Sequence, residues 1–537
     1  MDLDRRVCDR ARRSRDARFD GRFFIGVTTT GIYCRPICPA RAPKDENVRY
    51  FPTAAAAQAA GFRPCLRCRP EASPGTPAWS GTSGVVSRAL RLIAEGALDT
   101  DGVTRLADRL GVTDRHLRRL FLQHLGATPL EVALTRRVHF AKKLLDETAL
   151  SCHQVALAAG FGSLRRFNGE IRRTYSRTPT QLRRLARNRQ ATRPECYRFR
   201  LAYRPPYDWH GVLDFLAARA TPGVEQVDQG GYQRTITVDG LHGTIRVSQS
   251  ATGNALDLEV CFPSPRALLV IVERVKQLFD LGADPSVIAD QLANDATLRA
   301  AIRAHPGIRT PGAWDGFELA VRAIVGQQIS VRGATTIAGR IAAAFGSPLP
   351  LEGRGFSPVL THLFPTAAQL IDVPIEHAGV IAARANAIRA LARHVADGHL
   401  LFDPMHDSAA TVGALKQVPG IGEWTAQYIA MRALGEPDAF PSGDVVLQRI
   451  CGGVTARELD RLAEAWRPWR SYAVMLLWQS AAAAKKDPAN AGHRSNVGHR
   501  FRGAGAGDKQ NEILSDSHHS RRLRADPARR NAVQRAG

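Results

Sequence analysis

The 537-residue chain lacks long apolar runs and shows no sign of a secretion signal. No stretch of 18 apolar residues occurs, so we expect no membrane-spanning helix. The opening MDLDRRVCDRARRSR carries charge but no apolar segment, unlike a secretory signal. Nine cysteines in a chain of this length do not suggest a disulfide scaffold. We therefore expect a cytoplasmic protein in a reducing environment, with no membrane partner.

Acidic residues are scarce relative to basic ones. The chain has 50 Asp and Glu against 74 Lys and Arg, and its formal net charge is +24. The excess lies in 1–190 and 481–537, whereas 191–480 are close to neutral. Because most of this excess falls in patterned, foldable sequence, it favours a polyanionic partner, most simply double-stranded DNA.

Composition divides the chain into several parts and predicts a multidomain, mainly α protein with α+β parts. Helical periodicity dominates, and short alternating runs such as RTITVDG and LDLEVCF indicate strands in one segment. We expect a small zinc-bound α/β domain, an all-α DNA-binding domain, an α+β lobe packed on an all-α core, and a disordered tail. The expected segments are 1–72, a linker at 73–84, 85–186, 197–305, 306–482 and the basic tail at 483–537.

Four cysteines form two close pairs, C-x3-C and C-x2-C, separated by 26 residues. Two short turns that each present two sulfurs suit a tetrahedral zinc ion, so we predict Zn²⁺ as cofactor. Four buried free thiols are the alternative. The predicted ligands are Cys34, Cys38, Cys65 and Cys68.

The residues around these cysteines, TTTGIYCRPICPAR and AAGFRPCLRCRP, resemble the methyl-sensing zinc domain of the Ada family over about 17–72. The resemblance implies that Cys34 accepts a methyl group from a methylated DNA phosphate. Zinc keeps a cysteine as thiolate, the nucleophilic form. Methylation would change a site of charge −2 to −1 and so reduce its repulsion of phosphate. Four further residues could contact DNA phosphates or could simply lie on the solvated surface: Thr30, Arg35, Arg41 and Arg67.

A repeat occupies 85–186. Ala107 and Gly111 recur as Ala156 and Gly160, and Thr-Pro closes both copies. The pair resembles the double helix-turn-helix domain of AraC/XylS-type regulators, which implies two helices in successive major grooves. Some of their arginines would instead contact phosphates. The candidates are Arg115, His116, Arg118 and Arg119, and then Leu164, Arg165, Arg166 and Asn168.

The segment LKQVPGIGEWTAQYIAMRAL predicts two helices joined by a Pro-Gly-Ile-Gly turn. Gly420 and Gly422 allow a tight turn whose free N–H groups can hold a DNA phosphate. Asp444 follows about twenty residues later. The pattern resembles the helix-hairpin-helix glycosylases, in which this aspartate is catalytic.

A closer resemblance, over about 197–482, is to the AlkA-type 3-methyladenine DNA glycosylases. It rests on RPPYDWHGVLDFLAARA, FELAVRAIVGQQISV, the hairpin and WRPWRSYAVMLLW. It implies an aromatic pocket for a flipped-out, positively charged base, which cation–π attraction would favour. Core packing is the alternative for each ring. The pocket residues implied are Trp424, Tyr428, Trp478 and Phe215.

Asp444 would stabilise positive charge on the sugar, orient a water molecule, or do both. Members that cut the strand carry a lysine in the second hairpin helix, where this chain has Trp424. We therefore expect a monofunctional enzyme that leaves an abasic site. The family's wedge residue falls near Gln328, which is polar where an apolar side chain is common.

The leading interpretation is a fusion that excises alkylated bases and induces repair genes after Cys34 is methylated. The first alternative is a transcription regulator with an inactive glycosylase half. The second is a zinc DNA-binding protein without methyl transfer. We expect a monomer that binds alkylated DNA and promoter sites, with RNA polymerase as a candidate partner. No Pro-Cys-His-Arg motif occurs, so direct O6-guanine repair is not expected.

Overall fold

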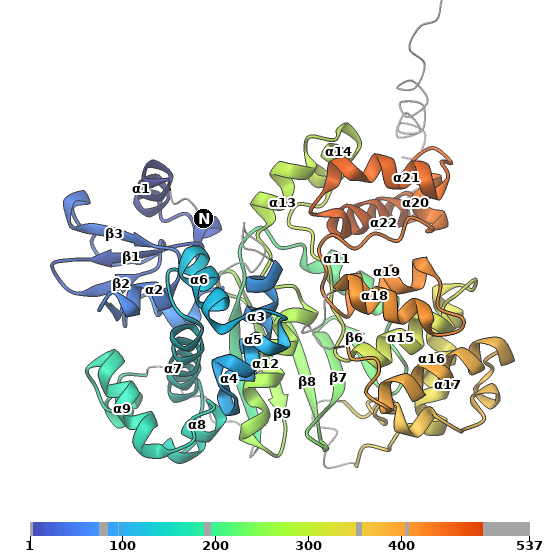
Figure 1. Cartoon of the computed structure of the whole chain (residues 1–537), viewed down its shortest axis with the longest axis horizontal. Helices are drawn as coiled ribbons and strands as arrows, with labels where there is room; N and C mark the ends of the chain where they lie inside the picture. The colour runs from blue at the N-terminus through green and yellow to red at the C-terminus, as the bar shows by residue number, and fades with distance from the viewer. Residues whose placement is uncertain are drawn as a thin grey trace, which may run out of the picture.

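The computed structural model describes residues 4–74, 84–94, 96–186, 195–350, 357–402 and 408–486. Helices predominate, and the described residues form two sheets (Figure 1). This confirms the mainly α fold class with α+β parts. No helix within the described ranges is long and apolar enough to cross a membrane. The greater part of the predicted linker and tail, 75–83 and 487–537, lies outside the described residues.

The N-terminal domain is a four-stranded sheet in the order β3-β1-β2-β4. The central strand β1 pairs antiparallel with β2 and β3, whereas β2 pairs parallel with β4. Phe24, Tyr33, Phe51 and Phe62 form a core on one face of this sheet. The elements are α1 (Arg5–Ser14), β1 (Phe24–Val27), β2 (Ile32–Cys34), β3 (Val48–Phe51), α2 (Ala54–Ala59) and β4 (Arg63–Pro64).

The predicted repeat forms two helix-turn-helix units, α5–α6 and α8–α9, joined by the long helix α7. Gly111 and Gly160 turn between the paired helices with φ of 68° and 79°, which explains glycine at both positions. Thr128 and Thr178 begin the following helices with capping boxes. The helices are α3 (Gly84–Ala94), α4 (Ala97–Thr100), α5 (Val103–Arg109), α6 (Asp114–Leu125), α7 (Pro129–Glu147), α8 (Cys152–Ala158), α9 (Leu164–Tyr175) and α10 (Pro179–Leu185).

The next part contains a five-stranded antiparallel sheet in the order β5-β9-β8-β7-β6. Cys196 on β5 lies opposite Cys261 on β9, and the two form a disulfide that the sequence analysis did not predict. The two cysteines are 65 residues apart in the sequence, so their spacing does not predict the pairing. The register of β5 against β9 places them opposite each other. The elements are β5 (Cys196–Ala202), α11 (Trp209–Ala217), β6 (Glu225–Asp228), β7 (Gly231–Val238), β8 (Leu241–Gln249) and β9 (Ala255–Cys261).

The remaining helices form two groups with separate cores. One core joins α15–α19. In the other group α14 packs against α22, where Trp466 Nε1 donates to Asp295 at 3.0 Å and Tyr472 donates to Asp280 at 2.9 Å (Figure 1). Helices before and after residue 306 therefore share one core. The boundary expected between 197–305 and 306–482 runs through this core. The helices are α12 (Leu268–Leu278), α13 (Pro285–Leu292), α14 (Ala296–Ala304), α15 (Gly316–Val325), α16 (Val331–Phe345), α17 (Ala382–Ala396), α18 (Ser408–Gln417), α19 (Glu423–Arg432), α20 (Val445–Ile450), α21 (Ala456–Ala463) and α22 (Arg470–Lys486).

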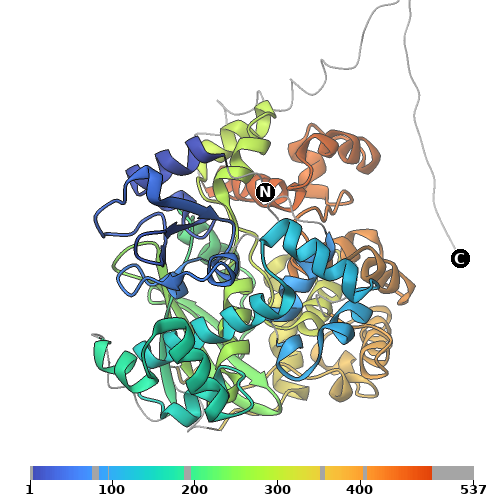
Figure 2. The same ribbon diagram turned by 60° about the vertical axis from the view of Figure 1, so that its left-hand side comes forward.

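The N-terminal domain and the helix-turn-helix units lie on one side of the C-terminal part (Figures 1 and 2). Helix α7 contributes to this contact. The ring of Phe140 lies 6.2 Å from that of Phe199 on β5, and Lys143 Nζ donates to the Arg200 carbonyl at 2.5 Å. Apolar residues of α7–α9 belong to the same buried cluster as the five-stranded sheet. The regulator-like and glycosylase-like parts therefore share a core.

Candidate metal centre, DNA-binding helices and base pocket

The four predicted metal ligands come together in the N-terminal domain. Their sulfurs all lie within 4.8 Å of one another. The parallel pairing of β2 with β4 explains this, because it sets Tyr33 opposite Pro64 and so brings Cys34 beside Cys65. A tetrahedral ion with metal–sulfur distances of about 2.3 Å needs sulfurs about 3.8 Å apart, so the cluster fits zinc.

Arg35 next to the cluster is part of the interior. It is 8% exposed, its Nε donates to Asp20 Oδ1 at 2.8 Å, and its Nη1 donates to the Cys68 carbonyl at 3.0 Å. The guanidinium thus holds together the segments around Cys34 and Cys68, and its expected role as a phosphate contact is not supported. The other three candidate phosphate contacts, Thr30, Arg41 and Arg67, are exposed. Cys34 itself is partly exposed, whereas Cys65 and Cys68 are buried.

The predicted recognition helices are α6 and α9. Each begins with a hydroxyl cap, Thr113 and Ser163. In α6, Arg118 Nε donates to Asp114 at 2.7 Å, so Asp114 orients it along the helix surface. The candidates Arg115, Arg118, Arg119, Leu164, Arg165, Arg166 and Asn168 are exposed, and His116 is partly exposed.

The predicted hairpin joins α18 to α19. Gly420 has φ of +88°, and a Cβ there would lie 2.7 Å from Ala387 Cβ, so glycine is required. Gly422 is the N-cap of α19 and is exposed. Gln327 Nε2 donates to the Gly420 carbonyl at 2.9 Å and to Thr425 Oγ1 at 3.0 Å. Sequence reasoning missed Gln327, which braces the turn from a distant loop.

Asp444 is the N-cap of α20 and accepts four hydrogen bonds. Oδ1 accepts from the backbone N–H groups of Val446 and Leu447 at 3.0 and 2.9 Å. Trp424 Nε1 donates to Oδ2 at 3.1 Å, and Trp478 Nε1 donates to Oδ1 at 3.3 Å. The predicted catalytic carboxylate thus contacts two of the four predicted pocket residues.

The four aromatic residues form one group. Trp424 and Tyr428 stack with centroids 5.4 Å apart and planes 8° apart, as the i,i+4 spacing on α19 predicts. Phe215 from α11 stacks on Trp478 at 6.4 Å, and Tyr428 lies 6.3 Å from Trp478. Phe215, which sequence reasoning could not separate from core packing, therefore lies with the others.

Two arginines that sequence reasoning missed lie behind these rings. The guanidinium carbon of Arg219 is 3.8 Å from the Phe215 centroid, and that of Arg432 is 4.7 Å from it. Burial raises the pKa of Tyr428, but the charges of Arg432, Arg219 and Arg322 outweigh this effect and lower it overall. Tyr428 is thus a partly buried phenol beside several arginine charges, an arrangement that residue type alone did not signal.

The expected wedge position lies in a strained turn beside the hairpin. Gln328 is exposed and has φ of +57°, a left-handed conformation. The next residue, Ile329, is apolar and 37% exposed. Val445 directly after Asp444 is 64% exposed. Exposed apolar side chains thus directly follow Gln328 and Asp444 in the chain.

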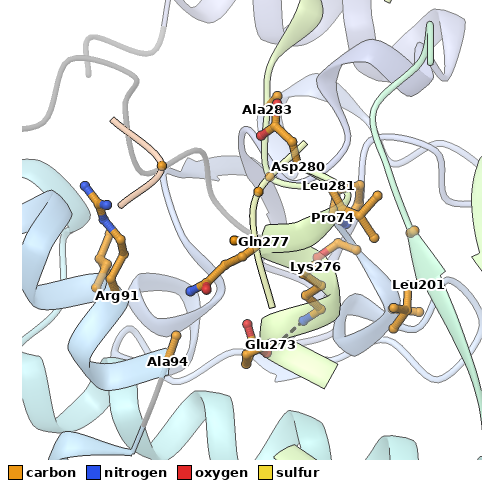
Figure 3. Close-up of a pocket in the computed structure, with 18 of the residues that line it drawn as sticks. Pro74, Arg91, Ala94, Leu201, Glu273, Lys276, Gln277, Asp280, Leu281 and Ala283 are labelled. Carbon is orange, nitrogen blue, oxygen red and sulfur yellow. Dashed lines mark hydrogen bonds and ion pairs between the residues drawn. The ribbon is translucent and has the colours of Figure 1, made fainter. Parts of the chain in front are cut away.

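A cavity of about 390 Å³ lies where the three parts of the chain meet (Figure 3). Pro74 follows the N-terminal domain, Arg91 lies on α3, Leu201 on β5 and Gln277 on α12. None of the four cysteines lines it, nor does Asp444. The cavity is therefore a junction between domains and not the site of the predicted chemistry.

Family models match four successive parts of the chain. The metal-binding domain of Ada matches residues 7–71, and a helix-turn-helix domain matches 106–185. The AlkA N-terminal domain matches 198–315, and the HhH-GPD superfamily of base excision DNA repair proteins matches 321–469. These matches follow the order of the predicted resemblances.

Relatives match both the whole chain and its parts. A probable bifunctional transcriptional activator/DNA repair enzyme AlkA of Mycobacterium tuberculosis (strain ATCC 25618 / H37Rv) is 45% identical over 88% of this chain and 95% of its own. DNA-3-methyladenine glycosylase 2 of Escherichia coli (strain K12) is 33% identical over 52% of this chain and 96% of its own. The bifunctional transcriptional activator/DNA repair enzyme Ada of the same organism is 41% identical over 22% of this chain and 31% of its own. The predicted resemblance is confirmed, and the chain belongs to the family of bifunctional transcriptional activator/DNA repair enzymes that join Ada-type and AlkA-type domains.

Proposed function

We propose that this protein excises alkylated, 3-methyladenine-type bases from DNA and regulates transcription in response to DNA methylation. The observation that carries the glycosylase half is the contact of Asp444 with both Trp424 and Trp478 beside the hairpin. An inactive relative would have no need to keep a carboxylate held by the donor groups of its own base pocket. Family membership and the metal cluster support the regulatory half.

The proposed excision breaks the bond between C1′ of the sugar and the base nitrogen. Alkylation at N3 or N7 gives the purine a positive charge, so the base departs neutral with the bonding electron pair. Asp444 stabilises the positive charge left on the sugar, and its carboxylate can accept a proton from the water that adds to C1′. Its four donors fix its orientation before DNA binds.

The product is proposed to be an abasic site on an uncut strand. Strand cleavage by this fold requires an amine that forms a Schiff base with the sugar. Trp424 occupies that place in α19, and the indole nitrogen is a donor to Asp444. Its lone pair belongs to the aromatic ring, so it cannot act as the nucleophile.

For the N-terminal domain we propose that Cys34 accepts a methyl group from a phosphotriester. Its sulfur forms a bond to the methyl carbon, the methyl–oxygen bond breaks, and the phosphate leaves as a diester anion. Cys38, Cys65 and Cys68 would hold the zinc ion together with Cys34, and bound zinc would keep the sulfurs as thiolates. Cys34 and Cys38 are both partly exposed whereas Cys65 and Cys68 are buried, so exposure favours the first pair, and the resemblance to the Ada domain selects Cys34 within it.

The glycosylase proposal is tested by base release from alkylated duplex DNA. Asp444→Asn keeps a good N-cap for α20 but removes the negative charge. We expect release to fall by about 10²–10³-fold, the usual loss for an essential electrostatic contact. The matched control is Asp397→Asn at an exposed position after α17. Equal release by wild type and Asp444→Asn would overturn the assignment of Asp444, and release by neither would favour the regulator without a working glycosylase.

The sensor proposal is tested by mass spectrometry after incubation with methylated DNA. We expect one added methyl group per chain, on the peptide that contains Cys34. The variant Cys152→Ser, outside the cluster, serves as control and should be methylated like the wild type. No methyl group on any of the four cluster cysteines would refute the methyl transfer and leave a plain zinc DNA-binding domain.

A further inference from the structure

The two recognition helices end in the same way. Helix α6 ends at Leu125 and has Gly126 as its C-cap, and α9 ends at Tyr175 and has Ser176 as its C-cap. Both caps have a left-handed backbone, with φ of 67° and 53°. They are 50 residues apart, the spacing at which Thr-Pro also recurs, so they occupy the same point of each helix-turn-helix unit.

The end of α6 is held by the segment that leads into α2 of the N-terminal domain. Thr53 is 6% exposed, and its Oγ1 donates to the Leu125 carbonyl at 2.8 Å. The last carbonyls of a helix have no partner within the helix, so this hydrogen bond satisfies a buried acceptor. A Cβ at Gly126 would lie 3.0 Å from Ala56 Cβ and 3.4 Å from Pro52 Cγ. The backbone of the cap therefore packs directly on this segment.

The end of α9 is held by β4 of the same domain. Arg63 Nη1 donates to Ser176 Oγ at 3.1 Å, and β4 packs against α9. The guanidinium lies at the C-terminus of α9, where a positive charge interacts favourably with the helix dipole. Tyr175 is 4% exposed; burial raises its pKa, and the charge of Glu71 in the N-terminal domain raises it further. The last turn of α9 therefore lies against the N-terminal domain.

The connecting helix α7 is held between these two ends. Helix α2 packs against α7 (Figure 1), and Thr135 Oγ1 donates to Gln58 Oε1 at 3.2 Å. The N-terminal domain thus contacts α6, α7 and α9. Neither helix-turn-helix unit can turn about α7 without breaking a contact with this domain.

The distance between two recognition helices decides which DNA they can bind together. Successive major grooves on one face of a duplex lie about 34–36 Å apart. One extra base pair between the half-sites moves the second half-site by about 3.4 Å and turns it by about 34°. Two units that pivot freely could follow this change, whereas two units held at their ends could not.

We propose that the N-terminal domain braces the two recognition helices and so sets the spacing of the DNA half-sites that the protein accepts, with Thr53 and Arg63 as the positioning residues. The inference rests on the proposed regulatory function and adds to it a determinant of DNA-site selection. It gives the N-terminal domain a role that does not depend on methyl transfer. Neither residue contacts DNA in this role.

The test measures binding of the full chain to duplexes that differ in spacing, with and without prior incubation of the protein with methylated DNA. Selection from a randomised duplex library supplies the preferred pair of half-sites. Further duplexes contain one inserted base pair between the half-sites, or a single half-site. We expect the wild type to bind the selected spacing at least 10-fold more tightly than the inserted one. Thr53→Val combined with Arg63→Gln should lower this ratio at least threefold and keep the affinity for the single half-site within twofold.

Further variants separate positioning from loss of structure and from direct DNA contact. Thr53→Ser keeps the hydroxyl and should keep the wild-type ratio. Arg10→Gln removes a positive charge from an exposed position on α1, well apart from α9 (Figure 1), and should also keep it. Arg63→Gln alone should lower the ratio, whereas loss of a phosphate contact would weaken binding to every duplex equally. Because the Arg63 side chain is exposed, this single variant tests the proposal even where Thr53→Val perturbs the fold.

The outcomes also distinguish this inference from the proposed function. Recovery of no preferred sequence by the wild type would overturn the regulatory proposal and the inference with it. Equal binding of both spacings by the wild type, or an unchanged ratio in Arg63→Gln, would overturn the inference alone. A spacing preference that falls in Arg63→Gln and in the double variant, and persists in Thr53→Ser, would support both.

Discussion

The hydroxyl of Tyr33 lies 2.9 Å from Nε2 of His139. Tyr33 directly precedes Cys34 on β2, and His139 lies on α7, which joins the two helix-turn-helix units. Gln58 Nε2 donates to the Tyr33 oxygen at 2.8 Å, and Thr135 Oγ1 donates to Gln58 Oε1 at 3.2 Å. A polar network therefore connects β2, which carries the proposed methyl acceptor, to helix α7 of the DNA-binding domain.

Disruption of this network should weaken the contact between the two domains without loss of metal. We expect Tyr33→Phe and His139→Gln each to lower the free energy of unfolding by about 1–2 kcal/mol, the cost of a buried polar group that loses its partner. Because the two side chains interact, the double variant should cost less than the sum. Denaturant unfolding and metal analysis of all four proteins provide the measurement. Additive effects, or loss of the metal, would contradict this interpretation.

The same contact predicts a pH dependence of stability. Burial lowers the pKa of His139 to about 4, so the unfolded chain binds more protons than the folded one between about pH 4 and 6.5. Stability should therefore fall as the pH drops through this window, by at most about 3 kcal/mol. The loss should be smaller than this limit because the ring is partly exposed. Unfolding of His139→Gln at pH 7.5 and pH 5 should lack this component, and an unchanged pH dependence would refute it.

Metal removal should affect the N-terminal domain first. The cluster links β2, β4 and the segments after them, so its loss should leave 4–74 sensitive to protease while 195–486 resist digestion. Cys38→Ser should lower the metal content from one ion per chain, and Cys152→Ser should not. Elemental analysis and limited proteolysis with and without a chelator check both points. A metal-free protein with an intact N-terminal domain would be the contrary result.

The contact of α7 with β5 should stabilise the whole chain. Phe140 is 6% exposed and packs on Phe199, so Phe140→Ala should lower the free energy of unfolding by about 3–5 kcal/mol. Leu130→Ala on the same helix is the matched control, since that side chain is 51% exposed and should change stability by less than about 0.5 kcal/mol. Thermal unfolding should show separate transitions for the two halves only in Phe140→Ala. Equal effects of the two substitutions would argue against a shared core.

The disulfide and the packing of the helices are two features that sequence patterns did not predict. The alternating runs predicted strands in 197–305, but the pairing of Cys196 with Cys261 depends on the register between β5 and β9. The periodic helices on both sides of residue 306 were also predicted, but the sharing of one core by α14 and α22 was not. Periodicity shows which face of an element is buried and leaves open what covers it.

The sequence by itself determined the features that depend on near neighbours. The two cysteine pairs, the capped and repeated helices, the Gly420 turn and the stacking of Trp424 on Tyr428 all follow from residues within a few positions of one another. Local hydrogen bonds and steric limits decide such features, and residue type and spacing record them.

Only the tertiary structure decided the long-range partners. It turned Arg35 inward to Asp20, set Tyr33 against His139 across 106 residues, and brought Arg432 beneath Phe215. A guanidinium has the same local signature whether it contacts solvent, DNA or an aromatic ring. Its partner depends on how distant elements pack, because that packing determines which side chains lose water together.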